Sequence, residues 1–204
     1  MTTSAELAIL DAHYMARALE LARKGHYTTH PNPRVGCVIV RDGQIVGEGW
    51  HERAGEPHAE VHALHAAGEL ARGATAYVTL EPCSHHGRTP PCADALVNAG
   101  VARVVAAMQD PNPEVAGRGL QRLAQAGIAT ESGVLEGEAR KLNQGFLKRM
   151  EHGLPFVRVK LAMSLDGRTA MESGESQWIT GPAARSAVQR LRAQASVVLT
   201  GADT

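Results

Sequence analysis

The pattern with the clearest chemical meaning combines one histidine, one glutamate and two cysteines. His58-Ala-Glu60 stands where a helix is predicted to begin, and Cys83 and Cys92 follow it along the chain. One imidazole nitrogen and two thiolates would give Zn²⁺ three ligands and leave the fourth tetrahedral position to water. Zinc in such a site lowers the pKa of its water toward about 7, and Glu60 could carry the proton. The residues therefore predict a catalytic zinc centre.

The same residues match part of a known signature. Zinc deaminases that act on cytosine or adenine carry His-x-Glu followed by Pro-Cys-x-x-Cys. His58-Ala-Glu60 and Pro82-Cys83 fit this order, whereas eight residues instead of two separate Cys83 from Cys92. The match favours hydrolytic deamination, and the cysteine spacing departs from the general pattern.

Other interpretations of these residues stay open. The two cysteines could be ordinary loop or core residues. A structural zinc would need a fourth protein ligand, which His85 or His86 could supply. His58 and His62 have the i, i+4 spacing of a zincin helix, but that pattern places glutamate directly after the first histidine, where this chain has Ala59.

Composition limits the classes of protein to which the chain can belong. It has 204 residues, 21 basic and 21 acidic side chains, and 44% apolar residues. A zero formal net charge argues against binding by bulk attraction to nucleic acid or anionic membrane. No signal-peptide pattern or apolar run of about 18 residues occurs. We therefore expect a soluble, cytoplasmic protein with reduced thiols, in which Cys37 is a core residue.

Apolar periodicity and turn residues predict the elements that position these side chains. A Thr3-x-x-Glu6 capping box opens a helix, Asp42-Gly43 marks a hairpin, and helices then alternate with strands. This order favours an α/β domain with helices on both faces of a sheet. Expected helices cover residues 7–22, 58–71, 92–99, 120–126, 136–151 and 183–195, and expected strands cover residues 35–40, 44–50, 75–80, 101–108, 128–131, 156–163 and 196–200.

A domain junction is expected at Gly153-Leu-Pro155. Only two strands and one helix follow it, which is too little to bury both faces of a sheet. We therefore expect one domain over residues 1–152 and the incomplete beginning of a second over residues 153–204.

With these residues placed, the chain resembles the bifunctional deaminase/reductase family of riboflavin biosynthesis. Residues 81–92 (EPCSHHGRTPPC) are similar to the long zinc loop of that family, which accounts for the wide cysteine spacing. Residues 30–40 and 49–60 resemble its other deaminase segments, and residues 155–168 and 176–180 resemble the start of its reductase domain. The resemblance implies a three-layer α/β/α cytidine-deaminase-like domain, followed by the N-terminal part of a dihydrofolate-reductase-like α/β domain.

The resemblance also implies a reaction and a set of site residues. A small pyrimidine, 2,5-diamino-6-ribosylamino-4(3H)-pyrimidinone 5′-phosphate, would lose its 2-amino group as ammonia. The matching positions are His58, Cys83 and Cys92 for zinc, Glu60 for proton transfer, Asn32 and His51 near the pyrimidine, and His85, Arg88, Asp110 and Asn112 near the rest of the substrate. Arg88 is the natural phosphate partner, because a guanidinium fork fits phosphate oxygens. Each substrate position could instead be a turn or surface residue.

In the family's second reaction, NADPH reduces the ribosyl group to a ribityl chain. The matching positions are Ala162, Trp178 and Thr204 for the cofactor, and Ser176 and Arg192 for the substrate. The family's catalytic acid and later phosphate-binding loop have no counterpart before Thr204. The 204-residue chain is therefore expected to deaminate and not to reduce.

Two other classes of function compete with this one. A zinc deaminase could act on a base flipped out of tRNA or on a free nucleoside, although the zero net charge, the few aromatics and the long zinc loop weigh against nucleic acid. A non-catalytic, zinc-stabilised binding module would need a complete four-ligand shell. We expect a small-molecule substrate and no nucleic-acid or membrane partner, and we leave a homo-oligomer open.

Overall fold

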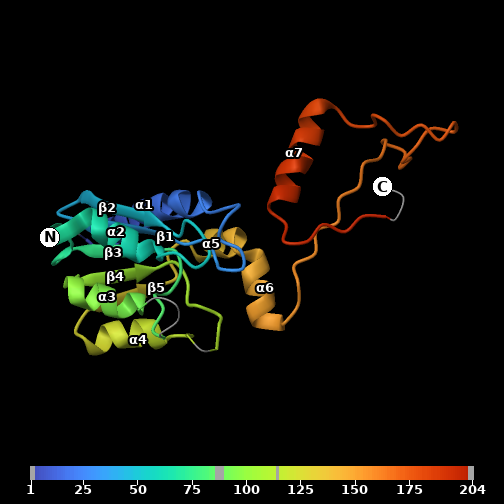
Figure 1. Ribbon diagram of the computed structural model, residues 1–204. Coiled ribbons are helices and arrows are strands. Elements are labelled where there is room, and N and C mark those ends of the chain that lie inside the picture. Colours follow the sequence, from blue (N-terminus) through green and yellow to red (C-terminus); the bar gives the residue numbers. More distant parts are fainter. Residues whose placement is uncertain (1–2, 86–89, 114, 202–204) are drawn as a thin grey trace. The chain divides into compact units, whose positions relative to one another are not determined.

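A five-stranded mixed sheet organises residues 1–156 of the computed structural model, which describes residues 3–85, 90–113 and 115–201 (Figure 1). β1 runs antiparallel to both of its neighbours, and β3, β4 and β5 are mutually parallel. The sheet order is β2-β1-β3-β4-β5, with β1 (Gly36–Arg41), β2 (Gln44–Trp50), β3 (Thr75–Val78), β4 (Arg103–Ala106) and β5 (Ala129–Ser132). All five strands predicted for this unit are therefore confirmed.

Helices cover both faces of this sheet. A Cβ atom at Gly36 would lie 2.0 Å from the Ala18 carbonyl oxygen, and one at Gly47 would lie 2.2 Å from the Ala63 carbonyl oxygen. Gly47 pairs with Ile39, and Ile39 and Gly36 are an odd number of residues apart, so the two glycines face opposite sides. The helices of this layer arrangement are α1 (Ser4–Arg23), α2 (Ala59–Ala67), α3 (Cys92–Ala99), α4 (Arg118–Gln125) and α5 (Glu136–Leu142).

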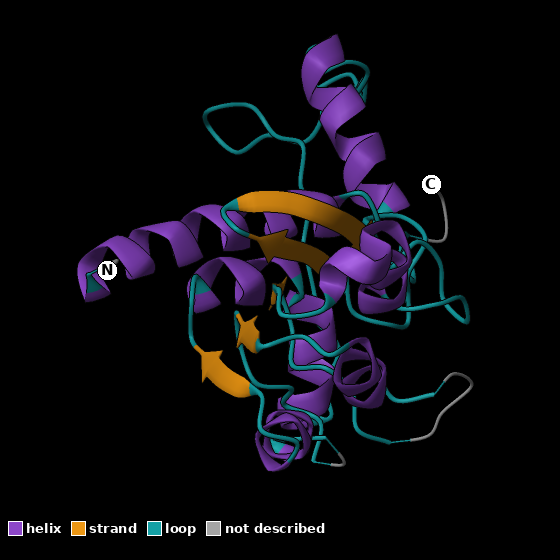
Figure 2. Cartoon of the chain, turned by 90° about the vertical axis from the view of Figure 1, so that its left-hand side faces the viewer, coloured by secondary structure: helices purple, strands orange, loops and turns teal. Residues whose placement is uncertain are grey.

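The two helical layers follow from these close approaches and from the contacts between helices. α1 packs on one face with α5, whereas α2, α3 and α4 contact one another in sequence on the other (Figures 1 and 2). The result is the three-layer α/β/α arrangement that the sequence predicts.

A buried ion pair ties α1 to the sheet. The carboxylate of Asp11, only 2% exposed, accepts hydrogen bonds from Arg103 at 2.7 and 2.8 Å and from the Tyr77 hydroxyl at 2.8 Å. Because Arg103 and Tyr77 lie on neighbouring strands, this network joins three elements on the face away from α2.

Two predicted helices differ from the structure in their bounds. The helix expected over residues 136–151 is two helices, α5 and α6 (Gln144–His152), which meet at Asn143. The Asn143 side chain binds both backbone polar groups of Arg34, and this contact takes the place of a continuous helix. The helix expected over residues 58–71 ends at Ala67 and continues as a 3₁₀ turn, η1 (Gly68–Ala71), because Gly68 adopts a positive φ of 53°.

The second unit, residues 157–204, contains the predicted helix as α7 (Pro182–Ala193). The strands expected over residues 156–163 and 196–200 are not formed in the described part of the chain, so that prediction is wrong. A strand needs a second strand to pair its backbone groups, and among the described residues the five strands of the sheet pair only with one another. Within the described ranges, no helix is long and apolar enough to cross a membrane.

Candidate active site

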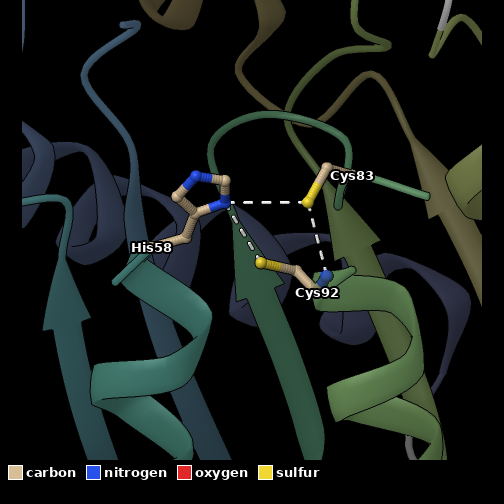
Figure 3. Close-up of side chains that lie close together, drawn as sticks. All are labelled: His58, Cys83 and Cys92. Carbon is tan, nitrogen blue, oxygen red and sulfur yellow. Dashed lines mark hydrogen bonds between the residues drawn. The ribbon is translucent and has the colours of Figure 1, made fainter. Parts of the chain in front are cut away.

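Three potential metal ligands meet beside the sheet. His58 is the N-cap of α2, Cys92 is the first residue of α3, and Cys83 lies in the segment between β3 and α3. The His58 Nδ1 atom lies 3.6 Å from the Cys83 sulfur and 3.3 Å from the Cys92 sulfur (Figure 3). All three side chains point toward one another from different elements.

The donor set and its spacing fit a zinc ion. The three ligand atoms lie within 4.8 Å of one another. Two ligands on one tetrahedral zinc, at about 2.05 Å for nitrogen and about 2.3 Å for sulfur, stand about 3.6 Å apart, and the observed nitrogen–sulfur distances are close to this value. Among the described residues the group contains these three donors and not His85, while His86 lies outside the described residues.

Local electrostatics favour a thiolate at this place. The hydrogen bonds from Cys92 lower the pKa of the Cys83 thiol well below its usual value, and His58 acts in the same direction. The Cys92 backbone N–H donates to the Cys83 sulfur at 3.3 Å. A thiolate is the form that binds zinc, so the electrostatics of the site favour metal binding.

Glu60 lies in the first turn of α2, two residues beyond His58, and is buried. Burial raises the pKa of its carboxyl group to about 7, and the charge of the Cys83 thiolate adds to the rise. The carboxyl group interacts with the Cys92 side chain, which places it directly beside the three-ligand group. This is the position that a proton carrier for a metal-activated water would need.

Asn32 and His51 form a pair next to the metal group. The Asn32 Nδ2 and His51 Nε2 atoms lie 3.1 Å apart, and His51 Nδ1 lies 3.1 Å from the Pro57 carbonyl oxygen. Burial lowers the pKa of His51, so its neutral ring donates from Nδ1 and accepts at Nε2 from Asn32. The His51 and His58 rings stand edge to face, 5.3 Å between centroids, so the pair adjoins the ligand group.

The Asp110 segment also reaches this region. The Asp110 carboxylate accepts the Asn112 backbone N–H at 2.9 Å. Its backbone N–H donates at 3.1 Å to Glu81, which lies two residues before Cys83. Burial raises the pKa of Asp110 to about 6, and the charge of Glu81 acts in the same direction. Of the sequence-predicted substrate residues, Arg88 lies outside the described residues.

The residues predicted for the second reaction do not form a comparable group. Trp178 is exposed, with the Arg185 guanidinium over its ring at 4.5 Å, and Arg192 lies in the last turn of α7. No hydrogen bond or ion pair among the described residues joins Ala162, Ser176 or Trp178 to Arg192. Thr204 lies outside the described residues.

Sequence reasoning missed two residues that shape the site. Asn143 fixes the backbone of Arg34, two residues beyond Asn32, and Glu81 binds the segment that carries Asp110. An asparagine that interrupts a long helical pattern and an acidic residue beside Pro-Cys were the only signals, and neither identifies its partner.

Comparison with known proteins identifies the family that the chain matches. Residues 9–108 match the model of the cytidine and deoxycytidylate deaminase zinc-binding region, and residues 155–204 match that of the RibD C-terminal domain. The chain is 71% identical over 194 residues to the riboflavin biosynthesis protein RibD of Escherichia coli. The aligned residues cover 95% of this chain and 53% of that relative. The chain belongs to the RibD family.

Solved RibD structures agree with this assignment. RibD of Acinetobacter baumannii has a TM-score of 0.88 at 63% identity, over 92% of this chain and 52% of that one. A deaminase/reductase of Thermotoga maritima, named for diaminohydroxyphosphoribosylaminopyrimidine and 5-amino-6-(5-phosphoribosylamino)uracil, has a TM-score of 0.86 at 44% identity, over 91% of this chain and 53% of that one. The cytidine-deaminase-like fold is thus confirmed, and the chain spans about half the length of the RibD relatives that it matches.

Proposed function

We propose that this chain carries the zinc-dependent deaminase activity of a RibD enzyme. The substrate would be 2,5-diamino-6-ribosylamino-4(3H)-pyrimidinone 5′-phosphate, and the product ammonia would come from its 2-amino group. The observation that carries the proposal is the convergence of His58, Cys83 and Cys92 beside the buried Glu60. Zinc held by these three ligands would lower the pKa of water enough to supply a hydroxide nucleophile at neutral pH.

The protein's own groups account for proton transfer and for orientation of the pyrimidine. Glu60 is shielded from bulk water, so it would exchange protons with the reactants and pass one to the departing amine. The Asn32 side-chain NH₂ group donates to His51. The Asn32 side-chain oxygen is then the group that would accept a hydrogen bond from an N–H of the pyrimidine ring. We assign the ribosyl phosphate to His85, Asp110 and Asn112, and its phosphate to Arg88.

Reduction by NADPH is the family's second activity, and the match over residues 155–204 supports assigning part of its site, not the whole reaction, to this chain. We propose contacts from Ala162, Trp178 and Thr204 to the cofactor and from Ser176 and Arg192 to the substrate. The 204-residue chain is expected to deaminate without consuming NADPH, as followed by NADPH absorbance. Consumption above a control without enzyme would contradict this expectation.

The three free cysteines support a cytoplasmic location.

Ammonia release from three substrates tests the deaminase proposal. The zinc-loaded chain receives the pyrimidine ribosyl phosphate, cytidine or tRNA at equal concentration. We expect release from the ribosyl phosphate alone. Deamination of tRNA or cytidine, with the ribosyl phosphate left intact, would instead assign the site to nucleic acid or to free nucleosides.

A further inference from the structure

Glu81 is a buried carboxylate that accepts hydrogen bonds from four backbone N–H groups of the described residues. It is 3% exposed and lies directly before Pro82-Cys83. One carboxylate oxygen accepts from Asp110 at 3.1 Å and Gly117 at 2.9 Å. The other accepts from Gly119 at 2.8 Å and Leu120 at 3.2 Å. Within the described residues, no lysine or arginine forms an ion pair with Glu81.

The segment that Glu81 binds lies directly against the loop that carries Cys83. A Cβ atom at Gly119 would fall 1.9 Å from the Pro82 carbonyl oxygen, so only glycine fits there. Gly117 precedes α4 with a φ of 80°, and no side chain within α4 caps its first turn. The Glu81 carboxylate supplies the missing acceptors for the N–H groups at this helix start, where a negative charge is also favourable.

We propose that Glu81 is a positioning residue that holds residues 110–113 and 115–120 against residues 81–83 and so orients Asp110 and Asn112 toward bound substrate. The inference rests on the proposed function, because those two residues are assigned to the ribosyl phosphate. Glu81 binds the Asp110 backbone N–H itself, and the Asp110 carboxylate in turn binds the Asn112 N–H at 2.9 Å. The Glu81 side chain thereby joins the segment that carries Cys83 to the segment that carries Asp110 and Asn112.

Replacement of Glu81 by glutamine separates this role from simple space filling. A carboxylate only accepts, whereas a glutamine amide has one accepting oxygen and one donating NH₂ group. With four N–H donors facing the side chain, Glu81→Gln must set its NH₂ against one pair of donors. Glu81→Asp keeps an acceptor-only group on a shorter side chain. Its KM for the pyrimidine ribosyl phosphate should therefore lie between the values for wild type and Glu81→Gln.

The matched control is Asp11→Asn. Asp11 is also a buried carboxylate, but it binds Arg103 and Tyr77 on the face of the sheet away from α2. Both variants should melt at lower temperature than wild type. We expect Glu81→Gln alone to raise KM for the pyrimidine ribosyl phosphate, by about tenfold, with a smaller change in kcat and with its zinc content retained.

A double variant shows whether Glu81 acts through Asp110. If it does, the KM increase caused by Glu81→Gln should largely disappear in an Asp110→Ala background, because contacting residues are not additive. An undiminished increase there, or a KM for Glu81→Gln equal to that of Asp11→Asn, would overturn the proposal and leave Glu81 as a purely structural residue.

Amide hydrogen exchange keeps this result distinct from failure of the proposed function. Exchange at Asp110, Gly117 and Gly119 should become faster in Glu81→Gln than in Asp11→Asn, whether or not substrate turns over. A wild-type chain that releases no ammonia refutes the proposed substrate, and the exchange rates then still test whether Glu81 holds this segment in place. Unchanged exchange at these amides refutes the positioning role of Glu81.

Discussion

Replacement of Asn143 by alanine should destabilise the N-terminal unit strongly for a residue outside the apolar core. The Asn143 side chain is 3% exposed; its Oδ1 accepts the Arg34 backbone N–H at 2.8 Å, and its Nδ2 donates to the Arg34 carbonyl oxygen at 2.9 Å. Each buried partner left without a hydrogen bond costs about 1–3 kcal/mol. Because Arg34 is half-buried, water can recover part of this loss.

We therefore expect Asn143→Ala to lower the free energy of unfolding by about 2–4 kcal/mol, which corresponds to a fall in Tm of roughly 5–15 °C for a chain of this size. Thermal unfolding followed by circular dichroism measures it. The control is Asn98→Ala, an exposed asparagine in α3, which should change stability by less than about 0.5 kcal/mol.

The comparison of the two asparagine variants decides the reasoning. Equal melting temperatures would show that the Arg34 contact contributes nothing and that another cause interrupts the helix at Asn143. If the contact is as strong as its geometry indicates, Asn143→Ala should also raise KM, because Arg34 lies two residues beyond Asn32 on the same loop.

Three further outcomes are expected. Glu60→Gln should reduce ammonia release by roughly 10²–10⁴-fold while metal analysis finds its zinc retained; a wild-type rate would exclude Glu60 as proton carrier. A chelator that removes zinc should abolish ammonia release and lower Tm, and added Zn²⁺ should restore both; activity that survives complete metal removal would contradict a catalytic role. Gly119→Ala should lower Tm because of its contact with Pro82, whereas Gly137→Ala, in α5 with open space around it, should raise stability by about 0.5–1 kcal/mol; equal melting temperatures for the two variants would refute the close approach.

The elements that could be predicted from the sequence are those fixed by neighbours in the chain. The Thr3 hydroxyl accepts the Glu6 backbone N–H at 3.2 Å, as the capping box requires. Asp42 and Gly43 both have positive φ, 50° and 75°, as expected for the hairpin turn. In each case the residues that decide the structure lie within a few positions of one another.

The predictions that failed depend on partners far along the chain. The break at Asn143 is set by Arg34, 109 residues away, and no helical pattern contains that information. The apolar alternation of Val157, Val159 and Leu161 suits a strand, yet these side chains are exposed and no strand is formed there in the described part of the chain. Periodicity reports what a segment can bury, and pairing requires a second segment.

The candidate site was partly predictable for a similar reason. Residue types and order were enough to single out His58, Cys83 and Cys92, because only a few residue types bind zinc. Glu81 carries no such signal: it binds backbone N–H groups 29 to 39 residues away, and any residue type except proline could supply them.

Strand direction explains why these residues meet at all. β1 is antiparallel to both β2 and β3, so β2 runs in the same direction as β3 and β4. Residues that follow these three strands therefore emerge at one edge of the sheet, as the carboxyl ends of parallel strands do. His58 follows β2, Glu81 and Cys83 follow β3, and Asp110 follows β4. The Glu81 contact can form only because the chain returns in the same direction after each crossover, and that return brings the metal ligands and the proposed substrate residues to the same edge.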